Sequence, residues 1–351
     1  MEDTLDYPLQ FHSLCTCHNQ QSLQAMIKSF EIFLPIVRGN FGLLEQLAFD
    51  FCKRQAEQKI IYTEVRYNPH LLAENGSFVK SNKPIDPRPV IDAITKGLRC
   101  GEKEFGITVN QILCCITWRP DWAEEIIDLA YEFRNNVPCA VVGVDIAAGE
   151  EHFDSIQHPD LYEPHYKAFQ KAQELGLNIT MHAGEVAGTK NIEIAVEKFG
   201  ATRIGHGYRI VSHPDVMRRM KEKKIHFEVC PTSSVETGGW NYTHKNWKEH
   251  PGMTMRKHGL DVGLNSDDPA VFNTSLTWQL RIAYAKMAMK KDAIWETILK
   301  SVDATFLSIE EKMKLKDRME AIKTNQEKTF EMCESSIEFT ERVVPWHNPH
   351  Q

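Results

Sequence analysis

Short apolar runs alternate with longer amphipathic stretches along most of this chain, and that alternation limits the folds it can adopt. Seven of the runs are rich in β-branched residues and are typical of buried strands. The stretches between them have the spacing of amphipathic helices, and such βα units form a parallel sheet covered by helices. The predicted strands lie at 59–67, 107–116, 139–147, 177–183, 202–208, 224–231 and 259–266.

Two α/β architectures fit this alternation. One is an open doubly wound sheet, but no predicted strand is followed by the G-x-G-x-x-G loop of a dinucleotide fold. The other is a (β/α)8 barrel of the TIM type, which needs eight strands in typically about 250 residues. Seven predicted strands are one short of a barrel. Residues 272–330 have a helical pattern and read as a last barrel helix with C-terminal helical additions.

Net charge, the length of apolar runs and the cysteine count limit which partners and which cell compartment are expected. The net charge of the 351 residues is −7 and there is no long basic run, so neither nucleic acid nor an anionic membrane surface is expected as a partner. No apolar run reaches the roughly 20 residues that span a bilayer, and the acidic N-terminus lacks the features of a secretory signal. The nine cysteines are an odd number and are interpreted as reduced thiols, so we expect a cytoplasmic protein.

Polar side chains recur where the predicted strands end. His182 and Glu185 follow one strand, His206 ends another, and Asp267 and Asp268 follow the last. A single histidine after a strand is more often a hydrogen-bonded structural residue. Ionisable groups at three such ends are harder to explain that way, because catalytic side chains of a barrel come from the C-terminal ends of its strands.

These residue types suit a zinc site. His182 and Asp267 are candidate ligands of one Zn²⁺, and Glu185 is a candidate acid. His206 is a candidate base or water-orienting group, and Asp268 could contact a substrate. Zinc lowers the pKa of bound water to about 7, so the set suits hydrolysis by a metal-bound water. No lysine ends the fourth predicted strand, which favours a single ion.

Several motifs closely resemble those of the adenosine deaminase family, in order and in spacing, over roughly residues 20–320. They are YTEVRYNPHLLA, MHAGEV, IGHGYR, HFEVCPTSS, TGGW and LNSDDPAVF. The resemblance implies a (β/α)8 barrel with one Zn²⁺. It also implies hydrolytic deamination of adenosine and 2′-deoxyadenosine to inosine in purine metabolism.

The resemblance also implies roles for individual residues. His182 and Asp267 match zinc ligands, and Glu185 matches the proton donor to purine N1. His206 matches the group that positions and deprotonates the attacking water, and Asp268 matches the carboxylate that contacts N7. A backbone N–H near Ala148 and Gly149 matches the contact to N3, although the family usually has glycine at the Ala148 position. An apolar lip over the substrate is matched by Met26, Ile27, Phe30 and Trp122.

The family's first strand is the part that this chain lacks. That strand ends in H-x-H and supplies two zinc ligands, and no H-x-H occurs here. Residues 9–17, which contain Cys15-x-Cys17, could form a short strand, but too few residues follow for a helical crossover. We therefore expect a barrel whose first strand is missing or replaced. Its predicted parts are an atypical segment 1–19, a barrel domain 20–330 and a tail 331–351.

Three functional readings follow. The first is an adenosine deaminase. The second is a truncated, impaired deaminase or a pseudoenzyme that binds nucleosides or a partner without turnover. The third is another mononuclear metal hydrolase on the same barrel. Conversion of adenosine by the chain would distinguish the first reading from the other two.

Overall fold

A computed structural model describes residues 7–17, 22–80, 82–241 and 246–330 of the chain. The chain forms two compact units, Met1–Phe306 and Leu307–Gln351. The boundary between them falls inside the domain predicted over 20–330, and the predicted tail 331–351 lies outside the described residues.

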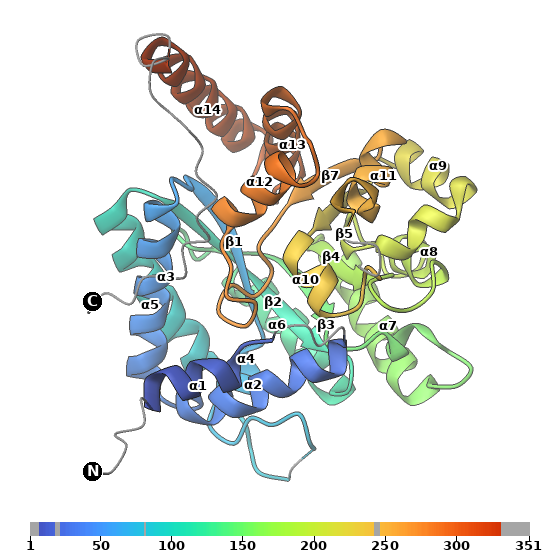
Figure 1. Cartoon of the computed structure of the whole chain (residues 1–351). Coiled ribbons are helices and arrows are strands. Elements are labelled where there is room, and N and C mark those ends of the chain that lie inside the picture. Colours follow the sequence, from blue (N-terminus) through green and yellow to red (C-terminus); the bar gives the residue numbers. More distant parts are fainter. Residues whose placement is uncertain (1–6, 18–21, 81, 242–245, 331–351) are drawn as a thin grey trace, which may run out of the picture. The chain divides into compact units, whose positions relative to one another are not determined.

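The first unit is built on a curled sheet of seven parallel strands, and all seven were predicted (Figure 1). Each strand pairs with the next one along the chain, so β1 and β7 form the two edges of the sheet. In the part of the chain that the structure describes, this is the predicted TIM-type barrel with one strand missing. The strands are β1 Tyr62–Tyr67, β2 Thr108–Ile116, β3 Val141–Ala147, β4 Asn178–Ala183, β5 Arg203–His206, β6 His226–Val229 and β7 Asp261–Leu264.

Helices connect successive strands, as parallel pairing requires. The glycine at the end of α5 has φ +68° and lets the chain leave that helix in the left-handed conformation. No helix in the described ranges is both long and apolar enough to cross a bilayer. The helices from β1 onward are α4 Pro69–Leu72, α5 Arg88–Phe105, α6 Ala123–Phe133, α7 Pro159–Glu174, α8 Lys190–Glu197, α9 Pro214–Glu222, α10 Pro231–Glu236, α11 Pro251–Lys257, α12 Leu276–Ala285 and α13 Lys291–Ala304. Short 3₁₀ turns are η1 Pro120–Trp122, η2 Glu151–Phe153, η3 Tyr208–Ser212 and η4 Trp247–Glu249.

The described residues before the first strand form three helices: α1 Tyr7–Cys15, α2 Leu23–Val37 and α3 Phe41–Glu57. The possibility that residues 9–17 form a strand is therefore wrong, because most of this run is helical. Ser22 caps α2 by accepting a hydrogen bond from the N–H of Ala25, and Asn40 caps α3 in the same way. No strand replaces the missing one among the described residues of this region.

The second unit contains α14, Ile309–Phe330. Ser308 and Glu311 form a capping box at its start, since the Glu311 carboxylate accepts from the Ser308 N–H at 2.9 Å and the Ser308 hydroxyl accepts from the Glu311 N–H at 3.3 Å.

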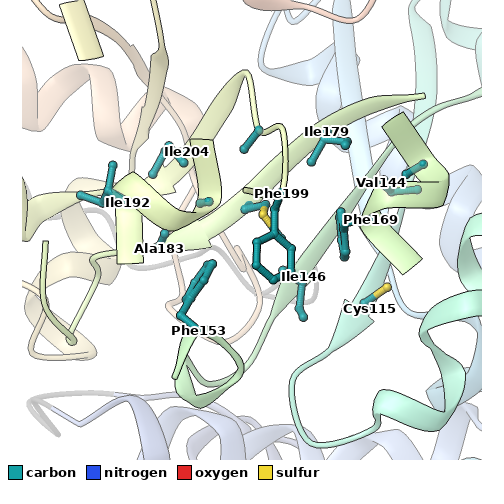
Figure 2. Packing of buried hydrophobic residues seen from close by; sticks show 14 of the residues in the cluster. Cys115, Val144, Ile146, Phe153, Phe169, Ile179, Ala183, Ile192, Phe199 and Ile204 are labelled. Atoms are coloured by element: carbon teal, nitrogen blue, oxygen red, sulfur yellow. The ribbon is translucent and has the colours of Figure 1, made fainter. Parts of the chain in front are cut away.

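The main apolar core lies between the strands and the helices outside them. Phe199 is fully buried at its centre and packs against Phe153 and Phe169, with ring centroids 5.7 and 5.8 Å away (Figure 2). Ile146 and Ile179 contribute side chains from β3 and β4 to the same cluster. Burying a side chain of this size stabilises a fold by about 1.5–3 kcal/mol, so this core fixes the strands that carry the site.

Charged side chains, most of them buried, cross the interior of the barrel. Arg66 on β1 pairs with Asp145 on β3 at 2.7 Å and with Glu228 on β6. Arg203 on β5 pairs with the same Glu228 at 2.8 Å and with Glu64 on β1. Burial alone would raise the pKa of Glu228, but the two guanidinium groups outweigh it and hold that pKa well below its usual range. These ion pairs tie the edge strand β1 to strands on the opposite side of the sheet.

Candidate active site

Three predicted residues converge at the ends of the strands. His182 near the end of β4, His206 at the end of β5 and Asp267 just after β7 each offer a ligand atom, and these atoms lie within 4.8 Å of one another. The side chains of His182 and Asp267 are each 16% exposed, so a small molecule can reach them. Two imidazole nitrogens and a carboxylate oxygen are donors that zinc accepts, so the residues present fit such an ion.

A buried carboxylate orients His182. Its Nδ1 lies 3.0 Å from Asp145 Oδ2 and 3.2 Å from Oδ1, and Asp145 is itself held by Arg66. With Nδ1 engaged, Nε2 is left for a metal, which is a common arrangement behind a metal-bound histidine. Burial disfavours the charged imidazole, but the Asp145 carboxylate outweighs it and raises the pKa of His182 to about 9.

His206 stands between two carboxylates. Its Nε2 lies 3.7 Å from Glu185 Oε2 and 3.8 Å from Asp267 Oδ2. Its other nitrogen lies 3.4 Å from the hydroxyl of Tyr208, which in turn donates to the Cys230 carbonyl at 3.1 Å. Glu185 is almost fully buried, and its Oε1 has no hydrogen-bond partner among the described residues. A buried acceptor of this kind is suited to a polar substrate group.

Asp268 follows Asp267 directly in the sequence. Burial, together with the neighbouring Asp267 carboxylate, raises the pKa of Asp268 well above its usual range. Its carbonyl accepts a hydrogen bond from the N–H of Phe272 at 3.0 Å. The side chain is therefore favoured in its protonated form, in which it can donate a hydrogen bond.

The backbone at these strand ends is strained. Ala148, His206 and Asp267 have φ values of +90°, +64° and +57°, and they follow or end β3, β5 and β7. Left-handed backbone costs a non-glycine residue about 1–3 kcal/mol and is concentrated at functional sites. Three of the nine non-glycine residues with positive φ among the described residues therefore lie at the predicted site.

The predicted apolar lip is only partly brought together. Met26, Ile27 and Phe30 of α2 belong to one apolar cluster with Ala148. Trp122 does not join them; it stacks on His70 at 4.9 Å in the main core, with the Arg119 guanidinium 3.5 Å above its ring. We define the lip cluster by its members: Cys17, Met26, Ile27, Val271 and Phe272, with Leu23, Phe30, Phe33, Phe78, Trp118 and Ala148 packed against them.

The turn after β3 carries Ala148 and Gly149. The Gly149 carbonyl accepts a hydrogen bond from the Thr117 hydroxyl at 2.7 Å, which fixes the orientation of this peptide. Trp118, the residue after Thr117, packs against Ala148's cluster and was missed by the sequence analysis. Its only signal was its place two residues after the end of β2.

The cysteines near the N-terminus take no part in the metal group. Cys17 is buried in the lip cluster, and its N–H donates to the carbonyl of Val271 at 2.8 Å. Burial, with a contribution from Glu236, raises the pKa of the Cys17 thiol to about 11, so it does not favour the thiolate that binds metals. Within the described ranges, the one group of three with metal-binding geometry is His182, His206 and Asp267. His18 lies outside those ranges.

The fold and the strand-end residues together define a class, that of (β/α)-barrel proteins whose site is suited to metal-assisted hydrolysis. The comparisons identify the family. The family model for adenosine deaminase matches residues 6–322. Adenosine deaminase from Xenopus tropicalis is 34% identical over 298 residues, which cover 84% of this chain and 80% of that protein. The chain therefore belongs to the adenosine deaminase family and is a hydrolytic deaminase by family.

Solved structures agree with the fold. Adenine deaminase from Arthrobacter aurescens superposes with a TM-score of 0.74 at 20% identity, over 92% of this chain and 91% of that one. An amidohydrolase from Burkholderia ambifaria with bound Zn gives a TM-score of 0.69 at 21% identity, over 90% and 92%. At these identities the likeness shows the fold alone.

Proposed function

We propose that this chain deaminates adenosine and 2′-deoxyadenosine to inosine products and ammonia, with one Zn²⁺ held by His182 and Asp267. The observation that carries the proposal is the meeting of His182, His206 and Asp267 beside the buried Glu185, in a member of the adenosine deaminase family. A bound zinc would supply a water acidic enough to attack at neutral pH.

The residues of the chain supply the rest of the chemistry. Glu185 protonates purine N1, which makes C6 electrophilic enough for water to add to the aromatic ring. Its burial and its unpartnered Oε1 support that role. His206 Nε2 faces both Glu185 and Asp267, which suits a group that positions the attacking water and takes its proton. Asp268, protonated, donates to the acceptor N7.

The lip and the β3 turn would hold the nucleoside. The backbone N–H groups at Ala148 and Gly149 are proposed to contact N3, and Met26 and Phe30 to cover the ring. Trp118 is a better candidate than Trp122 for the remaining apolar contact, because it packs with the lip cluster. We place the reaction in purine metabolism of the cytoplasm, and eight free cysteines among the described residues agree with a reducing compartment.

The test is zinc analysis of the purified chain, followed by the loss of adenosine absorbance near 265 nm. We expect bound zinc and turnover, and a fall in kcat of at least about 10²-fold in Glu185→Gln, which cannot donate the proton. Wild-type turnover in that variant would exclude the role of Glu185. A folded wild-type chain that lacks turnover would refute the proposed activity and favour a binding protein.

A further inference from the structure

One buried carboxylate organises the loop that carries Glu185. Glu150, just after β3, accepts hydrogen bonds from four consecutive backbone N–H groups after β4. Its Oε2 accepts from Gly184 at 2.6 Å, and its Oε1 accepts from Glu185, Val186 and Ala187 at 3.1 Å each. This concentration of donors on one side chain lies next to the site and has no part in the chemistry proposed above.

The geometry of the loop explains why a carboxylate is needed. Successive N–H groups that point to one side form a concave site for an anion, and Gly184, with φ +65°, makes the bend. The Asn191 amide donates to the same carboxylate at 3.0 Å. Glu150 is buried, so without it these backbone N–H groups would lose their partner away from bulk water. A further hydrogen bond fixes the start of the loop, because the Gly184 carbonyl accepts from the N–H of Arg209 at 2.9 Å.

We propose that Glu150 is a positioning residue for catalysis. Its carboxylate fixes the backbone at residues 184–187 and thereby holds the Glu185 side chain against His206, where a proton can be delivered to the substrate. The inference rests on the proposed role of Glu185. The connection between β3 and β4 would then have a role in catalysis, because it carries Glu150.

Two substitutions separate positioning from simple structural support. Glu150→Ala removes all five hydrogen bonds, whereas Glu150→Gln keeps one acceptor oxygen for residues 185–187. A misplacement of about 1 Å costs about 10²-fold in rate. We therefore expect kcat to fall about 10²-fold in Glu150→Ala with KM nearly unchanged, and to recover most of the way in Glu150→Gln. A structural role alone would reduce the active fraction and leave kcat per active site unaltered.

A second readout does not depend on activity. Hydrogen exchange of the 184–187 amides should accelerate at least about 10-fold in Glu150→Ala, while the amides of β2 keep their protection. Asp154→Ala is the matched control, because Asp154 follows the same strand and accepts from the N–H groups of Ile156 and Gln157 at 2.9 Å each. It should leave both the 184–187 amides and kcat unchanged.

The outcomes are distinct. Unchanged kcat and unchanged exchange in a folded Glu150→Ala protein would overturn the inference, as would an equal loss of kcat in Asp154→Ala. Absence of turnover in the wild-type chain would instead refute the proposed function. Exchange at 184–187 would then decide by itself whether Glu150 anchors the loop.

Discussion

At the scale of single residues, the site combines strain with buried charge. Ala148, His206 and Asp267 all adopt left-handed backbone, and Asp145 holds His182 in one orientation. The left-handed backbone costs stability and persists because neighbouring contacts fix it. The consequence is a set of side chains whose directions are determined before any ligand arrives.

Site residues could be predicted from the sequence only where they lie close to the end of a predicted strand. His182, Glu185, His206, Asp267 and Asp268 were identified because each lies at or near a strand end. Asp145 and Glu150 were not assigned roles, because the partners described above lie 34–79 positions away and only the fold brings them together. The sequence does contain one signal, since an aspartate inside the otherwise apolar β3 is an unusual strand residue.

A pair of buried histidines outside the site makes stability depend on pH. His152 Nδ1 forms a hydrogen bond with the Thr117 hydroxyl at 3.0 Å. His165 Nε2 donates a hydrogen bond to the Thr117 carbonyl at 3.0 Å. Burial lowers the pKa of His165 to about 4 and that of His152 well below its usual range. The unfolded chain, with an ordinary pKa near 6.5, therefore binds protons first as pH falls.

Protonation of these histidines therefore favours the unfolded chain as the pH falls. The contribution of His165 to the free energy of unfolding is fully present above about pH 7, and ~3 kcal/mol of it is lost between roughly pH 6.5 and pH 4. Urea unfolding at intervals from pH 4.5 to 7.5 measures it. We expect His165→Gln to reduce the slope of unfolding free energy against pH, and His258→Gln, at an exposed position, to leave it unchanged. Equal slopes in wild type and His165→Gln would contradict the assignment.

At the scale of elements, the contact between α3 and α5 depends on small residues. A Cβ at Gly97 of α5 would overlap the carbonyl oxygen of Glu45 and lie 2.8 Å from the Cβ of Ala48. The helices can approach this closely only because glycine has no side chain. Figure 1 shows them side by side next to β1.

Gly97→Ala should therefore destabilise the protein by about 1–3 kcal/mol, because the two helices must separate. Gly42→Ala in α3 is the control: its Cβ would meet only Asn40 Oδ1 at 3.9 Å, so the change should be neutral or stabilising by up to about 1 kcal/mol. Thermal unfolding of both variants measures the difference. A Gly97→Ala protein as stable as the control would show that the contact can relax.

Elements were predicted unevenly. The seven strands were found because β-branched runs are distinctive. Residues 9–17 were considered as a strand because Cys15-x-Cys17 repeats the spacing of the family's H-x-H, but most of that run is helical. Trp122 was placed at the lip by resemblance, but η1 turns it towards His70 and leaves Trp118 to pack there. The local sequence pattern predicts a strand or helix, but the directions of the side chains in the following turn depend on the conformation of that turn.

At the scale of the whole molecule, the metal group joins the ends of β4, β5 and β7. An ion that binds the folded chain and not the unfolded one stabilises it by about 2.7 kcal/mol at one hundred times its Kd. We expect added Zn²⁺ to raise the Tm by several degrees and a chelator to reverse the shift.

The matched variants are His182→Ala, which should lose the shift, and His258→Gln, which should keep it because its side chain is exposed and outside the metal group. A His182→Ala protein with a wild-type response to Zn²⁺ would place the ion elsewhere. Differential scanning calorimetry provides the measurement.

The ion pairs inside the barrel also bear on the order of synthesis. Arg66 on the first strand is paired with Glu228, 162 residues later, and Glu64 with Arg203, 139 residues later. A ribosome delivers the N-terminal residues first, and contacts this distant in sequence form slowly. Arg66 can pair with Asp145 once β3 has been made, whereas Glu64 waits for Arg203 on β5 and the second pair of Arg66 waits for Glu228 on β6. The ion pairs of β1 are complete only when roughly two-thirds of the chain has been made, and until then its unmatched charges are solvated by water.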